Sequence, residues 1–189
     1  MGKENSKINK LYLFLNAVYY CFWRFDIKTQ IVINKQLRMV FYPIWLFLPE
    51  KFKVKYKKDM ASQQNEIISY FYDKRNGFHI TMAYSYFTIT CYSYMSFISF
   101  ILFGLILKFY DVFNFLIGIV LFLPPVIITQ FILKNGVFKK DSYLTYFKKF
   151  EKENEQWHKK WGRITTAFCI GGILTFLAGV VAAFLIVMV

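Results

Sequence analysis

Three long stretches without a charged residue dominate the pattern of polar and apolar positions along this chain. They run from about Ala83 to Leu107, from Val112 to Leu133 and from Ile164 to Val189, and none of them contains Asp, Glu, Lys or Arg. Each is longer than the roughly 20 apolar residues that are needed to cross about 30 Å of hydrocarbon. The pattern therefore predicts an all-α, polytopic membrane protein with about three transmembrane helices.

The residues before these stretches form shorter aromatic and polar runs. Leu11–Phe25 is apolar almost all round but only fifteen residues long, which favours a helix lying in the membrane interface or packed on the other helices. A fourth, strained span is the alternative, and it would put the preceding tail outside. Met39–Leu48 is a second aromatic run, interrupted by Pro43, of the kind found at headgroup level. Met60–Tyr72 predicts a further helix, ended by a turn at Gly77.

A basic segment between Met39–Leu48 and Met60–Tyr72 alternates lysine with apolar residues at a period of two. In a strand this period would place the ammonium groups on one side and the apolar side chains on the other. Such a face would attract anionic lipid or nucleic acid, although the segment also fits a simple positively charged flank of a membrane span. Its bases are Lys51, Lys53, Lys55, Lys57 and Lys58.

The distribution of positive charge predicts the orientation in the membrane. The chain carries 24 Lys and Arg against 11 Asp and Glu, a formal net charge of +13. Fourteen of the bases precede the first span, one (Lys108) follows it, and nine lie in Lys134–Arg163. The positive-inside rule puts the N-terminus and the second loop in the cytoplasm and the C-terminus outside. We therefore expect a multi-pass protein of a cell inner membrane, without a cleaved signal peptide.

Four regions follow from this topology. Residues 1–80 are expected to form a basic, aromatic region in the cytoplasm or at the interface, and residues 81–134 a transmembrane hairpin. Residues 135–163 are expected to form a cytoplasmic amphipathic helix, and residues 164–189 the last transmembrane helix.

The first two predicted spans carry unusual residues for a membrane helix. Pro124 and Pro125 remove two backbone donors from the second span and predict a kink there. The first span is rich in hydroxyl groups, which bond across helices or face water, so we expect it to face protein or an aqueous path. Its candidate pore or helix-contact residues are Thr88, Thr90, Ser93, Ser96 and Ser99.

The third predicted span carries small residues at a strict four-residue spacing. Such a ridge lets another helix approach closely, either within the chain or in a second copy. We expect it to support a homo-oligomer. The oligomer-packing candidates are Ala167, Gly171, Thr175, Gly179 and Ala183.

The segment before the third span reads as an amphipathic helix over Asp141–Arg163. Asp141 and Ser142 are its candidate cap, and Gly162 alone weakens its continuation into the span. A continuous helix of 49 residues would be roughly 70 Å long, and a ring of several would form a vestibule. A helix lying flat on the membrane is the alternative. The apolar face of the predicted amphipathic helix consists of Tyr143, Phe147, Phe150, Trp157 and Trp161.

The sequence offers little chemistry for catalysis. It contains no GxxxxGK[ST], GxGxxG, GxSxG or HExxH pattern, and no carboxylate lies within a predicted span. Cys21, Cys91 and Cys169 have no metal-ligand spacing, so we predict no cofactor, no metal and no enzymatic activity. Arg75 and His79 are the one pair to consider as a degenerate Arg–His element of a ribonuclease, and Gly77 between them argues against an unbroken helix.

In layout the chain resembles the small membrane accessory proteins of RNA-targeting (type VI-B) CRISPR systems, some of which resemble ring-shaped pores with a degenerate Arg–His element. It also resembles two-span effector domains of other phage-defence operons. The resemblance lies in a small basic chain with an aromatic N-terminal region, few spans and a charged helix. It implies a role in antiviral defence, with a protein or ribonucleoprotein partner at the cytoplasmic face. The Arg75 to His79 spacing departs from that element by a residue.

Three functions remain open from the sequence. The first is a non-enzymatic, homo-oligomeric pore or effector that perturbs the bilayer when a cytoplasmic partner triggers it. The second is a monomeric intramembrane binding protein of the bacteriocin-immunity kind, with the small-residue ridge as its docking face. The third is a membrane-bound ribonuclease accessory that uses Arg75 or His79. Separately, Gly2 and Ser6 fit an N-myristoylation pattern.

Overall fold

A computed structural model describes residues 2–56, 58, 70–110 and 115–189, although the side chains of residues 2–9, 38, 44 and 115 are left out of this description. The described residues are almost entirely helical, and no strand occurs among them. The all-α class is therefore confirmed for this part of the chain. Lys57 and most of the predicted helix Met60–Tyr72 lie outside the described residues.

Three of the helices are long and apolar enough to cross a membrane. They are α3 (Phe78–Tyr110), α4 (Phe115–Gly136) and α6 (Glu155–Met188). Each contains most of one predicted stretch and extends beyond it, because hydrogen-bonded turns continue into the flanking polar residues. The prediction of about three such helices is confirmed.

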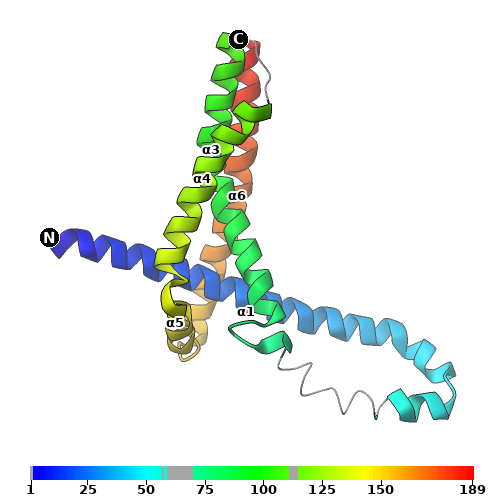
Figure 1. Cartoon of the computed structure of the whole chain (residues 1–189). Coiled ribbons are helices and arrows are strands. Elements are labelled where there is room, and N and C mark those ends of the chain that lie inside the picture. The colour runs from blue at the N-terminus through cyan, green and yellow to red at the C-terminus, as the bar shows by residue number, and fades with distance from the viewer. Residues whose placement is uncertain (1, 57, 59–69, 111–114) are drawn as a thin grey trace. The chain divides into compact units, whose positions relative to one another are not determined.

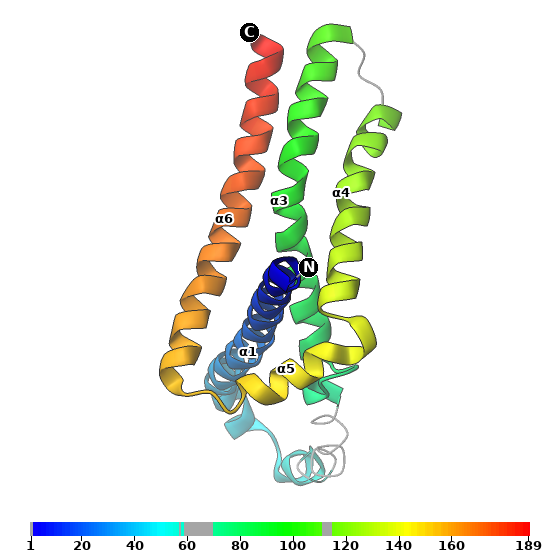
Figure 2. The ribbon, with the colours of Figure 1, turned by 90° about the vertical axis from the view of Figure 1, so that its left-hand side faces the viewer.

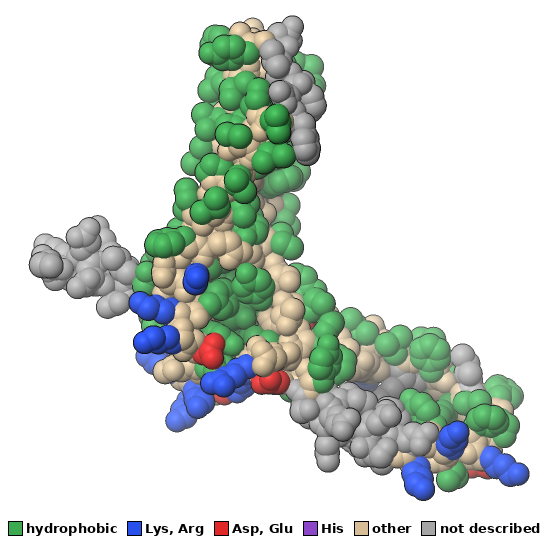
Figure 3. Space-filling view, viewed as in Figure 1, with side chains coloured by type: hydrophobic (Ala, Val, Ile, Leu, Met, Phe, Trp, Pro, Cys, Tyr) green, Lys and Arg blue, Asp and Glu red, His purple; other side chains and the backbone are tan. Residues whose placement is uncertain are grey.

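The three helices run side by side, with α3 between α4 and α6 (Figure 1, Figure 2). The ring of Phe100 on α3 contacts both neighbours. It lies 4.9 Å from the ring of Phe122 on α4 and 5.2 Å from the ring of Phe176 on α6. The flanks of the three helices that face away from these contacts are covered by apolar side chains (Figure 3).

Helix α1 (Gly2–Phe47) is far longer than the fifteen-residue segment expected at Leu11–Phe25. It passes through Pro43, which was expected to interrupt the second aromatic run, and ends before Pro49, in keeping with the restriction that a proline places on the residue before it. Residues 50–56 form another helical segment. The strand that a period of two suggests for the basic segment is therefore wrong.

The chain divides into two compact parts. One consists of Met1–Cys21 with Ser85–Val189, and the other of Phe22–Tyr84. The first contains α4, α6 and most of α3 together with the start of α1. The second contains the rest of α1 and the first turns of α3.

The predicted continuous helix from Asp141 to the end of the chain is wrong. A short 3-10 turn, η1 (Lys139–Asp141), is followed by α5 (Ser142–Phe150), and the chain then leaves the helical conformation before α6 begins at Glu155. The side chain of Asn154 accepts a hydrogen bond from the backbone N–H of Trp157 at 2.8 Å and caps α6. This local cap competes with helix continuation, so the continuous helix of 49 residues does not form.

Candidate functional site

At the end of the bundle where α4 ends and α6 begins, α5 lies between the two helices (Figure 2). A cluster of aromatic rings packs at this end. We call this cluster the aromatic base. Helices α1, α3, α5 and α6 and the turn after α4 all contribute rings to it. Its members are Tyr19, Tyr20, Phe87, Phe138, Tyr143, Phe147, Phe150 and Trp157.

Tyr19 lies at the centre of the aromatic base and is 2% exposed. Its ring centroid lies 5.5 Å from that of Phe87 on α3, 5.3 Å from that of Phe138 and 5.5 Å from that of Phe147 on α5. Distances and tilts of this kind are the favourable ones for aromatic pairs. One residue of α1 therefore holds three other segments of the chain together.

Tyr20, the next residue of α1, extends the base toward α6. Its ring lies 5.1 Å from that of Phe147 and 6.3 Å from that of Trp157. Trp157 also stacks on Phe150 at 4.9 Å. The predicted apolar face of Asp141–Arg163 thus exists, but its members come from two helices that fold against each other and against α1. A helix lying flat is not needed to explain it.

A buried amide ties α1 to the end of α4. The Nδ2 group of Asn16, which is 0% exposed, donates to the carbonyl oxygen of Gly136 at 3.0 Å and to that of Tyr12 at 2.7 Å. The last carbonyls of a helix have no donor within the helix, so Asn16 supplies one from outside. The buried Oδ1 atom of Asn16 has no hydrogen-bond partner. This role is not visible in the sequence, because a single Asn within an apolar run does not indicate which group it bonds to.

The corner between α4 and α5 contains the two described non-glycine residues with positive φ. Lys140 has φ of 50° and Asp141 has φ of 56°. The Asp141 side chain does not cap α5 by a hydrogen bond, which corrects the predicted cap. The hydroxyl of Ser142 instead donates to the carbonyl oxygen of Val137 at 2.9 Å. Left-handed backbone at a non-glycine residue is costly, and here the buried Val137 and Tyr143 on either side hold the corner.

The hydroxyl groups of α3 divide into two kinds. Those of Thr90, Ser93 and Ser96 donate to carbonyls of α3 itself, at 2.8 to 3.0 Å. The hydroxyl of Ser99 crosses to α4 and donates to the carbonyl of Leu121 at 2.7 Å. Thr88 is buried, and its hydroxyl has no hydrogen-bond partner. Of the five predicted contact residues, Ser99 bonds to a carbonyl of α4, and the Thr90 side chain also makes a hydrogen bond with the Cys169 side chain on α6.

Pro125 of α4 explains the hydrogen bond from Ser99 to the Leu121 carbonyl. A residue at position 125 would normally donate its N–H to the carbonyl four residues back, which is that of Leu121. Pro125 has no N–H, so it leaves this carbonyl without a donor in its own helix. Ser99 supplies the missing donor. Helix α4 continues through both Pro124 and Pro125, and the Thr129 hydroxyl donates to the Pro125 carbonyl at 2.7 Å.

The small-residue ridge of α6 faces α3 of the same chain at three positions. A Cβ at Gly171 would collide with the Tyr94 hydroxyl, and a Cβ at Gly179 would lie 3.3 Å from the Phe97 backbone. Ala183 lies against Gly104, at which a Cβ would approach the Ala183 Cα to 2.8 Å. The two remaining members, Ala167 and Thr175, are exposed and half-buried respectively.

The two residues of the predicted Arg–His pair differ in their exposure to solvent. His79 is 1% exposed, and its Nδ1 atom lies 2.6 Å from an oxygen of Asp26 on α1. Arg75 is exposed in the turn before α3, where its backbone N–H donates to the Asp73 carboxylate at 3.0 Å. The buried ring of His79 is not open to a substrate phosphate. No cluster of potential metal ligands occurs among the residues that the structure describes.

The predicted basic surface is helical in the structure. In a helix Lys51, Lys55 and Lys58 share one face at steps of four and three, and Lys53 points away from them. The ammonium group of Lys53 pairs with the Glu50 carboxylate at 2.9 Å. The position of Lys57 lies outside the described residues.

No protein-family model, curated protein or solved structure matches this chain.

Proposed function

We propose that α3, α4 and α6 cross the inner membrane of a cell, and that the chain is a non-enzymatic membrane effector. In this proposal several copies assemble into a pore that perturbs the bilayer when a cytoplasmic partner engages the aromatic base. The length and apolar character of the three helices support their insertion. The excess of Lys and Arg around the aromatic base supports a cytoplasmic position for the aromatic base and for the N-terminus, with the C-terminus outside.

The aromatic base is the observation that carries the proposal. It joins the end of α4 and the start of α6 to a single buried stretch of α1 around Tyr19. Close-packed interiors transmit displacement rather than absorb it. A partner that moved α1 or α5 would therefore displace the ends of two membrane helices at once, which is the kind of movement that opens or repacks a helical assembly.

The charge around the base favours an acidic partner. Residues 134–163 contain nine Lys and Arg and four Asp and Glu, which gives 9 − 4 = +5. Basic side chains gather on this end of the bundle in the space-filling view (Figure 3). An acidic protein surface or a ribonucleoprotein would be attracted to them, in keeping with an accessory role in antiviral defence. The exposed bases here include Lys139, Lys140, Lys148, Lys149 and Lys152.

A second function is favoured by the packing of α6. Because Gly171, Gly179 and Ala183 lie against α3 of the same chain, the ridge is used without a second copy. This supports a monomeric intramembrane binding protein of the bacteriocin-immunity kind, whose docking face would then be the outer flank of α4 or α6 rather than the ridge. Gly118 on α4 has open space where a Cβ would be, so a foreign helix could approach there.

The mass of the protein in lipid nanodiscs and its ion conductance in planar bilayers distinguish the two functions. Several copies with measurable conductance would support the pore. A single copy without conductance would exclude it and leave the binding protein. The informative variant is Gly118→Leu on the open flank of α4, with Gly162→Leu as its control, since a Cβ at Gly162 also meets open space. Loss of the oligomer in Gly118→Leu alone would locate the contact between copies on α4.

A further inference from the structure

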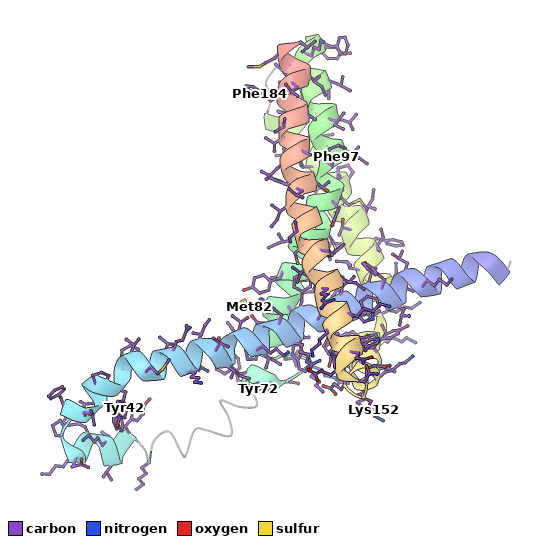
Figure 4. The ribbon with its side chains drawn as sticks, turned by 180° about the vertical axis from the view of Figure 1, so that it is seen from behind. Tyr42, Tyr72, Met82, Phe97, Lys152 and Phe184 are labelled. Carbon is purple, nitrogen blue, oxygen red and sulfur yellow. The ribbon has the colours of Figure 1, made fainter. Side chains whose placement is uncertain are left out.

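The second half of α1 is a helix without a buried face. Described side chains from residue 24 to the end of the helix are exposed or half-buried, and all of residues 31–37 are exposed. Many of these side chains are large and apolar, and they project all round the helix (Figure 4). Examples with their exposed fractions are Val32 55%, Val40 67%, Phe41 56%, Leu46 56% and Phe47 89%.

Such a helix requires a covering surface. Most helical stability in proteins comes from the packing of an apolar face, and isolated short helices are marginal in water. This stretch also contains the β-branched run Ile31-Val32-Ile33, which has low helix propensity. An exposed apolar surface of this size marks an interaction site.

The helical segment after Pro49 folds back on the end of α1. The ring of Tyr56 lies 5.3 Å from that of Trp45, and the Lys53 ammonium reaches the Leu46 carbonyl at 3.5 Å. Phe52 and Tyr56 share one face of this segment at a step of four, and Lys51 and Lys55 share another. We call residues 22–58 the basic arm.

The charge of the basic arm identifies what covers it. Residues 22–58 contain nine Lys and Arg and two Asp and Glu, which gives 9 − 2 = +7. Arg24, Lys28 and Lys35 recur on one side of α1 at steps of four and seven. A second copy would bring +7 against +7, and a nucleic acid would leave the aliphatic side chains in water. A membrane surface with anionic headgroups satisfies both the charge and the apolar side chains.

We propose that the basic arm lies in the headgroup region of an anionic bilayer, with its exposed aromatic and aliphatic side chains in the acyl boundary and its Lys and Arg side chains on phosphate groups. Interfacial helices combine these two features. Aromatic residues such as Trp45 and Tyr42 favour this depth. The arm is then a lipid-binding element that senses surface charge, and its binding does not depend on whether the chain forms a pore.

Hydrogen exchange followed by mass spectrometry tests this in the full-length protein. The protein is placed in nanodiscs of phosphatidylcholine alone and in nanodiscs containing about one quarter phosphatidylglycerol, at low and high salt. We expect peptides covering 31–56 to exchange more slowly in the anionic nanodiscs at low salt. Replacing Lys51, Lys55 and Lys58 by Gln should remove about a hundredfold of that protection, since each base near an anionic surface contributes a factor of about five.

The matched control replaces Lys51, Lys55 and Lys58 by Arg, which keeps the three positive charges of the arm. It should leave the protection of 31–56 unchanged. Equal protection in both lipids, unaffected by the Gln variant, would overturn the proposal. So would protection that depends on protein concentration, which would indicate a second copy, or protection that appears only when an RNA oligonucleotide is added.

Discussion

The hydroxyl of Ser99 donates to the carbonyl oxygen of Leu121 at 2.7 Å, and this carbonyl is the one that Pro125 leaves without a donor in α4. The two residues belong to different helices, so the bond links a defect in one helix to a side chain of the next. In an apolar environment an unpaired carbonyl is costly, which makes Ser99 and Pro125 an energetically coupled pair.

We expect Ser99→Ala to destabilise the bundle by about 1–3 kcal/mol, because it leaves the Leu121 carbonyl without a hydrogen-bond donor between two apolar helices. In the Ser99→Ala, Pro125→Ala double variant the new N–H at position 125 can bond to Leu121, so most of the loss should be recovered. Unfolding in mixed detergent micelles measures both variants. Ser93→Ala is the control, because the Ser93 hydroxyl bonds to Ile89 in its own helix. Strictly additive effects would contradict the coupling.

Gly104→Ala should destabilise the protein by about 1–3 kcal/mol, since its Cβ would lie 2.8 Å from the Cα and the carbonyl oxygen of Ala183. Neither of those backbone atoms can move without shifting α6. Gly118→Ala introduces the same atom where nothing lies within 4 Å, and by helix propensity it should be neutral or stabilising by up to about 1 kcal/mol. Melting temperatures in detergent compare the two. Equal effects would mean that α3 and α6 are not in close contact.

Asn16→Ala is expected to cost about 1–3 kcal/mol, because the Gly136 carbonyl loses its donor from α1. The control is Asn34→Ala, which changes an exposed Asn of the same helix and should stay within about 0.5 kcal/mol of the parent protein. Thermal unfolding monitored by tryptophan fluorescence suits this test, since Trp157 belongs to the aromatic base. A tolerated Asn16→Ala would remove the proposed link between α1 and α4.

Asp26 and His79 should behave as a coupled structural pair. We expect Asp26→Ala and His79→Phe each to lower stability, and the double variant to lose less than their sum, with a coupling of about 0.5–3 kcal/mol. The basis is the 2.6 Å contact between the Asp26 carboxylate and the His79 ring. Thermal unfolding is the suitable measurement, because guanidinium chloride would screen the electrostatic interaction between Asp26 and His79. A ribonuclease activity that His79→Phe abolishes without loss of stability would instead restore the catalytic interpretation.

Much of the bundle follows from the sequence, while its contacts do not. Long uncharged stretches indicate apolar helices because the bilayer imposes a length and a polarity. The same stretches do not predict that Gly171 packs against Tyr94 of the same chain. The spacing of small residues on α6 would be the same if they packed against a second copy. Tyr19 looks like one aromatic residue among many until α1, α5 and the turn after α4 are folded together.

Local competition explains the other differences. Asn154 offers a cap in the middle of a predicted helix, and capping ends one helix and starts another at little cost. The alternation at Lys51–Tyr56 fits a strand by period alone, but this segment has no neighbouring strand among the described residues and becomes a helix. The Asn16 amide could not be placed from sequence, because its acceptor at Gly136 lies 120 residues away.

The position of α3 between two partners has a consequence for biosynthesis. Its most apolar stretch is less apolar than those of α4 and α6. Its hydrogen bonds to other helices involve Leu121, Gln130 and Phe168, which are all translated later. If α3 crosses a membrane as proposed, it would enter before either partner is translated, with Tyr and Ser side chains facing lipid. Under this proposal α3 would become stable in the membrane only when α4 and then α6 pack against it, so a chain stopped after α3 should be recognised and degraded.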